Sequence, residues 1–238
     1  MTSSLQIHGH EVDAVLFDAG GIFVIPDPHV VQPLLGYYGG SDDLDRYHRA
    51  HYAGMAAKSR ADSAESDWSV YNVAYVESVG VHPADVEEAS MVLDRTRSAW
   101  LWRHALADSV QALRELHERD VPIGVVSNAT GQIESVLARS KVCQVGDGHG
   151  VPVRVVVDSH VVGVAKPDPR IFDFGLEVLP GIDRSRVAYV GDSVTMDVGG
   201  ARNAGLLPVL LDPYDDHRRP DGSDPDFLRI TSLLDLLP

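Results

Sequence analysis

The hydrophobic positions of this chain fall into five short, nearly continuous runs that are separated by polar and helix-like stretches. Runs of this length, several of them rich in β-branched residues, are typical of strands buried on both faces of a parallel sheet. The five runs are Ala14–Phe17, Val121–Val126, Val153–Val157, Val187–Val190 and Leu207–Leu211.

Helical patterns lie between most of these runs. Residues 106–116 carry apolar side chains at the spacing of an amphipathic helix. Asp168 and Pro169 predict a helix start, as N-cap and first helical residue. The segment after Ser193 predicts a helix that ends near Gly205. Strands that alternate with helices predict an α/β fold with a doubly wound, Rossmann-like parallel sheet.

Residues 26–100 are the exception, because they contain no comparable apolar run. Three stretches there have helical patterns, namely 42–58, 67–79 and 83–100. The simplest organisation is an α/β core of residues 1–25 and 101–238, with a helical domain of residues 26–100 inserted after the first strand. Such an insertion often serves as a cap over a site at the carboxyl ends of the strands.

The composition is that of a globular protein, and the charge is strongly acidic. Of 238 residues, 44% are hydrophobic and 23% are charged, and the formal net charge is -15. Phosphate contacts need clustered Lys and Arg, and an anionic membrane would repel this chain, so we expect neither nucleic acid nor a membrane as a partner.

Targeting signals and disulfides are not expected either. Cys143 is the only cysteine, which rules out an internal disulfide. Residues 1–11 are polar and contain no apolar stretch of signal-peptide length, and no segment approaches the length of a membrane helix. We therefore expect a soluble, cytoplasmic protein.

Two of the expected strands end in residues that can carry chemistry. Asp18 ends the first strand, and Gly20 and Gly21 after it let a ligand approach the backbone closely. Ser127 and Asn128 end the second, where a hydroxyl, an amide and free N–H groups can bind an oxyanion at a helix start. Taken alone, Asp18 is equally typical of an ordinary turn after a strand, and Ser127 and Asn128 are more typical of ordinary caps and turns.

Two further sites add a cation and more carboxylates. Lys166, one of only three lysines, lies in a stiff segment with two prolines, where it can neutralise a phosphate and a carboxylate together. Asp192 follows a glycine at the tip of the fourth strand, and Asp197 lies one turn into the next helix. With Asp18 they would form an oxygen-rich site suited to Mg²⁺. Taken alone, Lys166 is also typical of an exposed proline turn, and either aspartate of a helix N-cap.

Together and in this order, the four sites resemble the four motifs of the haloacid dehalogenase-like (HAD) superfamily. The resemblance covers about residues 12–24 and 103–212. It is closest in Lys166-Pro167-Asp168-Pro169, in Gly191-Asp192-Ser193 through Asp197, and in the following Gly199–Gly205. An insertion directly after the first motif is similar to the helical cap of the phosphatase and phosphoglucomutase-like branch.

The resemblance implies a Mg²⁺-dependent hydrolase that acts on a small phosphorylated metabolite. It implies that Asp18 is the nucleophile, which attacks phosphorus to give an aspartyl-phosphate that water then hydrolyses. Ser127 would hold a phosphate oxygen, with Asn128 nearby, and Lys166 would add positive charge to the phosphoryl group. The sequence identifies neither the metabolite nor an oligomeric state.

The resemblance also implies the metal ligands. Mg²⁺ would lie between the Asp18 carboxylate, the backbone carbonyl of Gly20 and Asp192, where it screens the repulsion between carboxylate and phosphate. Asp197 would support either the metal-bound water or Lys166.

The chain departs from the family pattern at Gly20. Phosphatases of the superfamily usually carry a second aspartate at this position, which protonates the leaving group and activates the water. General acid–base catalysis contributes about 10²–10⁴-fold. Gly20 therefore predicts a slow phosphatase, a replacement proton donor, a substrate with a good leaving group, or lost catalysis. Asp27 and His29 follow nearby, but no feature of the sequence directs either to the site.

Three other interpretations stay open. A catalytically silent protein that binds a phosphorylated ligand or a protein partner would account for Gly20, although it would have no reason to keep costly carboxylates together. A phosphonate C–P hydrolase of this superfamily carries a small residue at that position and a cap lysine, here Lys58, but tends to have arginine in place of Lys166. A dehalogenase carries an aromatic residue at that position and lacks an acidic residue such as Asp192.

Overall fold

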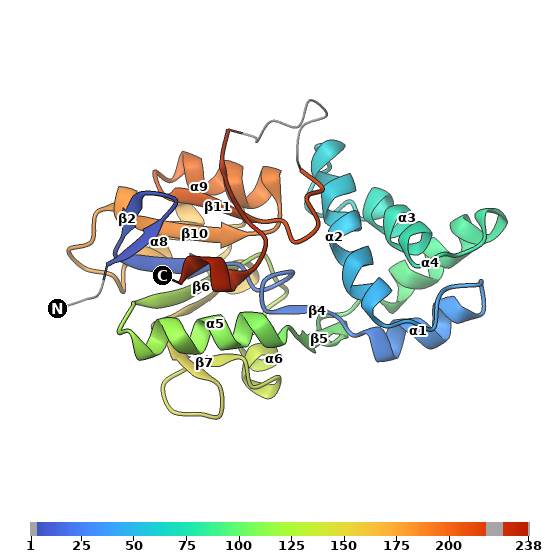
Figure 1. The fold of residues 1–238 in the computed structure, drawn as a ribbon, viewed down its shortest axis with the longest axis horizontal. Helices are drawn as coiled ribbons and strands as arrows, with labels where there is room; N and C mark the ends of the chain where they lie inside the picture. Colours follow the sequence, from blue (N-terminus) through green and yellow to red (C-terminus); the bar gives the residue numbers. More distant parts are fainter. Residues whose placement is uncertain (1–3, 218–225, 238) are drawn as a thin grey trace. The chain divides into compact units, whose positions relative to one another are not determined.

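The computed structural model describes residues 4–217 and 226–237 of the chain. The chain forms two compact units, one built from residues up to Val24 and from Ala105 onward, the other from Ile25–His104. The first unit contains a large parallel sheet with helices on both faces, and the second is predominantly helical (Figure 1).

A six-stranded sheet forms the centre of the first unit, and every pair of neighbouring strands in it is parallel. The strand order is β12 (Leu228–Ile230), β11 (Leu207–Leu211), β10 (Val187–Gly191), β3 (Ala14–Phe17), β6 (Ile123–Ser127), β9 (Val156–Asp158). The order runs outward in both directions from β3, so the strand order reverses at the centre of the sheet. The predicted doubly wound α/β fold is confirmed.

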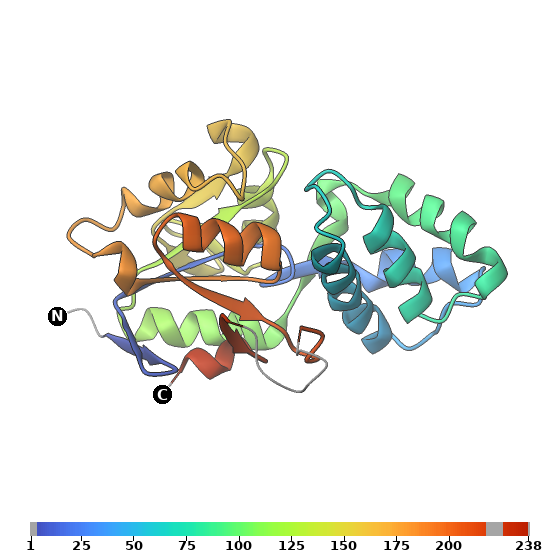
Figure 2. The ribbon, with the colours of Figure 1, turned by 90° about the horizontal axis from the view of Figure 1, so that it is seen from above.

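Helices cover both faces of this sheet. One core cluster joins the inward side chains of β3 and β10 to α8 (Arg170–Leu176) and α9 (Gly200–Asn203). Figure 2 shows α5 (Ala107–Glu118) on the opposite side of the sheet from α8. This unit also contains α6 (Ile133–Arg139), α7 (Ser159–Val162), a π-helical segment at Val194–Gly199, and short 3-10 helices at Arg184–Arg186 and Leu233–Leu236.

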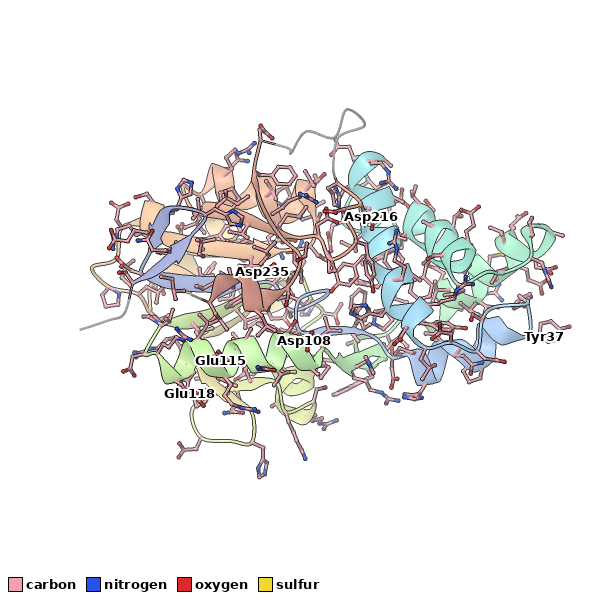
Figure 3. The ribbon with its side chains drawn as sticks, viewed as in Figure 1. Tyr37, Asp108, Glu115, Glu118, Asp216 and Asp235 are labelled. Carbon is pink, nitrogen blue, oxygen red and sulfur yellow. The ribbon has the colours of Figure 1, made fainter. Side chains whose placement is uncertain are left out.

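Helix α5 shows how the acidic composition is accommodated. Leu113 and Leu116 are fully buried on one side of the helix. Asp108, Glu115 and Glu118 project from it elsewhere, and Asp108 and Glu118 are exposed to solvent (Figure 3). The helix is amphipathic, as its apolar spacing predicted.

The third apolar run forms two short strands instead of one. Residues Val151–Val153 form β8, which pairs with β7 (Cys143–Val145) in a separate two-stranded sheet, and β9 begins only at Val156. Between them, the N–H of Arg154 donates to the Ile123 carbonyl at 2.8 Å, which starts the pairing with β6. The prediction of a single strand over Val153–Val157 is wrong, because the chain changes its pairing partner within the run.

Helix α8 begins one residue later than predicted. Its first helical residue is Arg170 and its N-cap position is Pro169. The Asp168 carboxylate accepts a hydrogen bond from the Arg170 N–H at 3.0 Å and pairs with the Arg170 guanidinium, so it closes the turn just before the helix.

The second unit contains four α-helices, two short 3-10 helices at Pro83–Asp85 and Ala99–Leu101, and a short strand pair. The α-helices are α1 (Pro28–Gly36), α2 (Asp45–Arg60), α3 (Ser69–Ser78) and α4 (Val86–Thr96). Strands β4 (Val24–Pro26) and β5 (Trp102–Ala105) pair where the chain enters and leaves the unit. Its core is rich in aromatic side chains, among which Tyr47, Tyr71 and Tyr75 are almost completely buried. Within the residues that the structure describes, none of the helices has the length and hydropathy to cross a bilayer.

Candidate active site

The candidate site lies where the central strands of the sheet end. Phe17, the last residue of β3, pairs with Val125 on β6 and with Val190 on β10. The N–H of Asp18 donates to the Val190 carbonyl at 2.9 Å, so Asp18 continues the ladder one residue beyond the strand. Because carboxyl ends of parallel strands meet at one edge, this register brings Asp18 and Ser127 to the same edge.

Asp18 and Lys166 form a buried ion pair. Lys166 Nζ lies 3.0 Å from Asp18 Oδ1, and the two side chains are 1% and 14% exposed. Burial raises the pKa of Asp18, the Asp197 and Asp192 carboxylates raise it further, and Lys166 and a hydrogen bond from Ser127 oppose the increase. Burial alone would lower the pKa of Lys166, but Asp18 and Asp197 hold it above its ordinary value. The lysine is therefore a permanent cation beside the carboxylate.

Lys166 is held at both its backbone and its ammonium group. Its N–H donates to Asn128 Oδ1 at 2.8 Å, and its carbonyl accepts from Asn128 Nδ2 at 3.1 Å. Its ammonium donates to Asp197 Oδ1 at 2.7 Å and to Tyr189 Oη at 2.8 Å. The oxygen and the nitrogen of the Asn128 amide thus each make one hydrogen bond to the Lys166 backbone, and its predicted contact with phosphate remains a prediction.

Asp197 connects Lys166 to the end of β10. While Oδ1 accepts from Lys166, Oδ2 accepts from the N–H groups of Asp192 at 3.1 Å and Ser193 at 2.9 Å. The carboxylate can approach this closely only because residue 191 is glycine, since a Cβ atom there would lie 2.2 Å from Asp197 Cγ. Asp197 therefore fixes both the lysine and the loop that carries Asp192.

The carboxylates of the site suit a hard cation. One oxygen from each of Asp18, Asp192 and Asp197 lies within 4.8 Å of the others. Asp18 Oδ1 is buried and accepts no hydrogen bond from the residues that the structure describes, although it forms an ion pair with Lys166. An all-oxygen set without His or Cys fits Mg²⁺. Hydrogen bonds already engage both oxygens of Asp197, which makes it less available as a ligand than Asp18.

Gly20 and Gly21 lie in a tight turn directly after Asp18. The N–H of Gly21 donates to the Val24 carbonyl at 2.9 Å, and the N–H of Phe23 donates to the Ala19 carbonyl at 2.9 Å. Gly21 has a φ of 69°, a conformation that favours glycine, whereas Gly20 is not among the residues with positive φ. The backbone conformation at Gly20 is therefore compatible with a side chain. The turn itself does not require glycine in place of aspartate at this position.

Asp27 and His29 belong to the second unit, where Asp27 has a structural role. Asp27 is the N-cap of α1 and accepts a hydrogen bond from the His29 N–H at 3.1 Å. It also pairs with Arg103, whose Nε lies 2.8 Å from its carboxylate. These contacts account for Asp27 without any part in proton transfer.

Lys58 is buried inside the same helical unit. Its Nζ donates to the carbonyls of Glu65 at 2.7 Å and Asp67 at 2.8 Å, and it lies 4.2 Å from the centre of the Trp68 ring. Burial lowers the pKa of Lys58, and the nearby Glu65 and Asp67 oppose this effect. The contacts hold the turn between α2 and α3, so Lys58 has a structural explanation.

Tyr189 was not predicted from the sequence to belong to the site. It lies within β10 and is 1% exposed, yet its hydroxyl contacts both Lys166 and Asp197. A signal was present, because a tyrosine in an otherwise aliphatic buried strand needs a partner for its hydroxyl.

Comparison with known proteins points to one family. Residues 12–205 match the sequence model of a family described as haloacid dehalogenase-like hydrolase. The chain is 37% identical over 116 residues to a pyrimidine 5'-nucleotidase, YjjG, of Escherichia coli K12, a match that covers 48% of this chain and 47% of that protein. It is 31% identical over 151 residues to a phosphoserine phosphatase of Thermus thermophilus, covering 61% and 56%. The chain thus matches about half the length of these relatives.

Solved structures show the same fold. A HAD hydrolase from Bacillus subtilis, bound to magnesium, has a TM-score of 0.57 and 16% identity over 94% of this chain and 96% of that one. A HAD phosphatase from Thermococcus onnurineus has a TM-score of 0.54 and 22% identity over 94% and 96%.

Proposed function

Because this chain belongs to the haloacid dehalogenase-like hydrolase family, we propose that it is a Mg²⁺-dependent phosphatase of a small phosphorylated metabolite, with Asp18 as nucleophile. The observation that carries the proposal is the buried pair of Asp18 and Lys166, 3.0 Å apart at the carboxyl ends of the strands. A nucleophilic carboxylate beside a permanent cation suits attack on an anionic phosphoryl group. Relatives named as phosphatases or nucleotidases support a phosphate ester as the substrate.

Asp18, Lys166 and Ser127 have separate roles in the two steps of the proposed reaction. An Asp18 oxygen attacks phosphorus, the bond from phosphorus to the leaving oxygen breaks, and the leaving group departs with the electron pair. Water then attacks the aspartyl-phosphate, the bond from phosphorus to the Asp18 oxygen breaks, and inorganic phosphate and the free carboxylate result. Lys166 stabilises the negative charge on the phosphoryl oxygens in both steps, and Ser127 donates its hydroxyl to one of them.

The metal would be held by Asp18, Asp192 and the Gly20 carbonyl. When bound, Mg²⁺ supplies charge that screens the approach of the carboxylate to the phosphate. Asp197 serves this set indirectly, because it holds the backbone on either side of Asp192 and the ammonium of Lys166.

Gly20 sets the chemical limits of the reaction. Without a side chain there, the leaving group receives no proton from that position, and the water of the second step loses its base. A substrate whose leaving group is stable as an anion avoids the first of these losses. We therefore expect slow turnover of ordinary alkyl phosphates and faster turnover of phosphates with acidic leaving groups.

The proposal is tested with p-nitrophenyl phosphate, whose leaving group needs little protonation. Hydrolysis by the purified protein should require Mg²⁺, stop with EDTA, and be lost in Asp18→Asn. Asp108→Asn is the matched control, because Asp108 is an exposed residue of α5 in the same unit (Figure 3). Absence of turnover from a folded wild-type protein in Mg²⁺ would overturn the phosphatase proposal.

Gly20 also favours a second candidate, a silent protein that binds a phosphorylated ligand. A silent binder would turn over no substrate. It would bind an oxyanion such as tungstate saturably, and Lys166 would be required for that binding. The phosphonate-cleaving alternative is less well supported, because two carbonyls and a ring hold the amine of Lys58 inside the helical unit.

A further inference from the structure

The hydroxyl of Tyr189 lies at the junction of three parts of the candidate site. The ring is buried in the sheet core, edge-on to Phe172 at a centroid distance of 4.8 Å. The oxygen lies 2.8 Å from Lys166 Nζ, 2.8 Å from the Val126 carbonyl and 3.3 Å from Asp197 Oδ1. Val126 directly precedes Ser127 on β6. The Tyr189 hydroxyl therefore links Lys166, Asp197 and the strand that carries Ser127.

Only one arrangement of protons satisfies these contacts well. An ammonium group can only donate, so the Tyr189 oxygen must accept from Lys166. The hydroxyl has a single proton, and the Val126 carbonyl is its shorter contact. Asp197 Oδ1 already accepts from Lys166 at 2.7 Å. Tyr189 therefore accepts from the lysine and donates to the strand that carries Ser127.

This arrangement determines where the third N–H of Lys166 points. An ammonium group has three N–H bonds and rotates about a single bond when nothing holds it. Asp197 and Tyr189 take two of them, and the remaining neighbour is Asp18 Oδ1 at 3.0 Å. The third N–H is thus left on the side of the ammonium group that faces Asp18, with which Lys166 forms an ion pair.

From this geometry we propose that Tyr189 is a positioning residue, which fixes the rotation of the Lys166 ammonium and aims its third N–H at Asp18 and the transferred phosphoryl group. The catalytic consequence rests on the proposed phosphatase function, whereas the placement of the lysine does not. Tyr189 does not touch the substrate in this scheme. It acts through Lys166 alone.

The variant that tests the proposal is Tyr189→Phe, which removes the oxygen and keeps the ring against Phe172. A hydrogen bond to a charged group corresponds to a loss of about tenfold to a hundredfold in kcat for p-nitrophenyl phosphate. KM should change by less than about threefold, because the ammonium remains and the lost interaction is with a developing charge. Tyr75→Phe is the matched control, since Tyr75 is equally buried and its hydroxyl has no hydrogen-bond partner in the described part of the chain.

A second readout does not depend on activity. The chain has only three lysines, so ¹⁵N-lysine labelling gives at most three side-chain ammonium signals. Lys141 is exposed, whereas Lys58 and Lys166 are buried and should exchange their protons slowly. Lys166→Arg assigns the Lys166 signal by its loss. In Tyr189→Phe the Lys166 signal should shift or exchange faster, and the Lys58 signal should stay unchanged.

The outcomes separate the two proposals. A changed Lys166 signal with reduced kcat supports the positioning role. An unchanged Lys166 signal in a folded Tyr189→Phe protein overturns it, and so does a changed signal with full kcat and KM. If the wild-type protein turns over no phosphate ester, the proposed function fails. The Lys166 signal of Tyr189→Phe still tests the placement of the lysine: a changed signal shows that Tyr189 holds it, and an unchanged signal shows that it does not.

Discussion

The carboxylate of Asp197 lies against the backbone of Gly191, in space that a Cβ atom would otherwise fill. Such an atom would come within 2.2 Å of Asp197 Cγ and 2.3 Å of Oδ2. The same carboxylate orders Lys166 and the N–H groups of Asp192 and Ser193. The absence of a side chain at Gly191 thus allows the buried Asp197 to position both Lys166 and Asp192, a proposed metal ligand.

Gly191→Ala should therefore displace Asp197 and loosen the site. Overpacking of a well-packed interior lowers the free energy of unfolding by about 1–3 kcal/mol. We expect at least a tenfold loss of kcat/KM, about 1.4 kcal/mol, measured with p-nitrophenyl phosphate beside urea unfolding. Gly199→Ala is the control, since its added Cβ would meet only Val194 O at an ordinary 3.6 Å. Equal activity of the two variants would contradict the steric argument.

Gly20→Asp should install the proton-transferring group that the turn lacks. Gly20 does not have a positive φ, so the backbone accepts a side chain there. For an alkyl phosphate such as glycerol phosphate we expect kcat to rise by about 10²-fold, the lower end of the usual general-acid contribution. For p-nitrophenyl phosphate the rise should be small, because that leaving group needs no proton.

Gly20→Asn separates proton transfer from mere occupancy of the turn. It has the size and polarity of aspartate but cannot act as an acid at neutral pH. A similar gain in both variants would show that the effect comes from binding or rigidity. No gain in Gly20→Asp would indicate that another group already supplies the proton.

The strands at the centre of the sheet could be predicted because their environment is nearly uniform. Every residue of β3, β6 and β10 is buried, and such strands are continuous apolar runs whatever their neighbours are. The break between β8 and β9 could not be predicted, since it depends on which strands the chain pairs with. Helix α1 was missed as well, because Pro33 lies inside it and interrupts the helical pattern.

The residues of the site were predictable to a different extent. Asp18, Lys166 and Asp192 follow a recognisable order along the chain, and the structure brings Asp18 and Lys166 together. Which atoms of Asn128 and Asp197 are engaged, and where the Tyr189 hydroxyl points, depend on contacts between distant segments. No local pattern reports such contacts.

Asp18 should lower the stability of the metal-free protein near neutral pH. Its ordinary pKa is 3.8, and burial raises it to about 7 in the folded state. Between these values the folded protein binds the proton more tightly than the unfolded chain does, so its stability falls as the pH rises through this window. Asp18→Asn cannot ionise. The free energy of unfolding of Asp18→Asn, relative to that of the wild type, should therefore increase as the pH rises from about 4 to about 8.

Urea unfolding of both proteins in EDTA at several pH values measures this difference. Mg²⁺ should reduce it at the upper end of the range, because a cation that binds the ionised carboxylate stabilises the folded wild type. A difference that stays constant with pH would contradict a raised pKa at Asp18.

Asn128 offers a choice between two roles that kinetics can resolve. Its amide makes two hydrogen bonds to the backbone of Lys166, at 2.8 Å and 3.1 Å. If clamping is its function, Asn128→Ala should lower kcat with little change in KM, and should lower the free energy of unfolding by about 1–3 kcal/mol, because two backbone groups lose their partners. If Asn128 also holds the phosphate, KM should rise in addition to this loss of stability. Asn128→Asp sharpens the comparison. Its carboxylate can still accept from the Lys166 N–H but repels the Lys166 carbonyl, so a clamp predicts an intermediate loss of stability. If Asn128 contacts the phosphate, KM should rise more in Asn128→Asp than in Asn128→Ala, since the new carboxylate would add to the negative charge of Asp18 that faces the substrate.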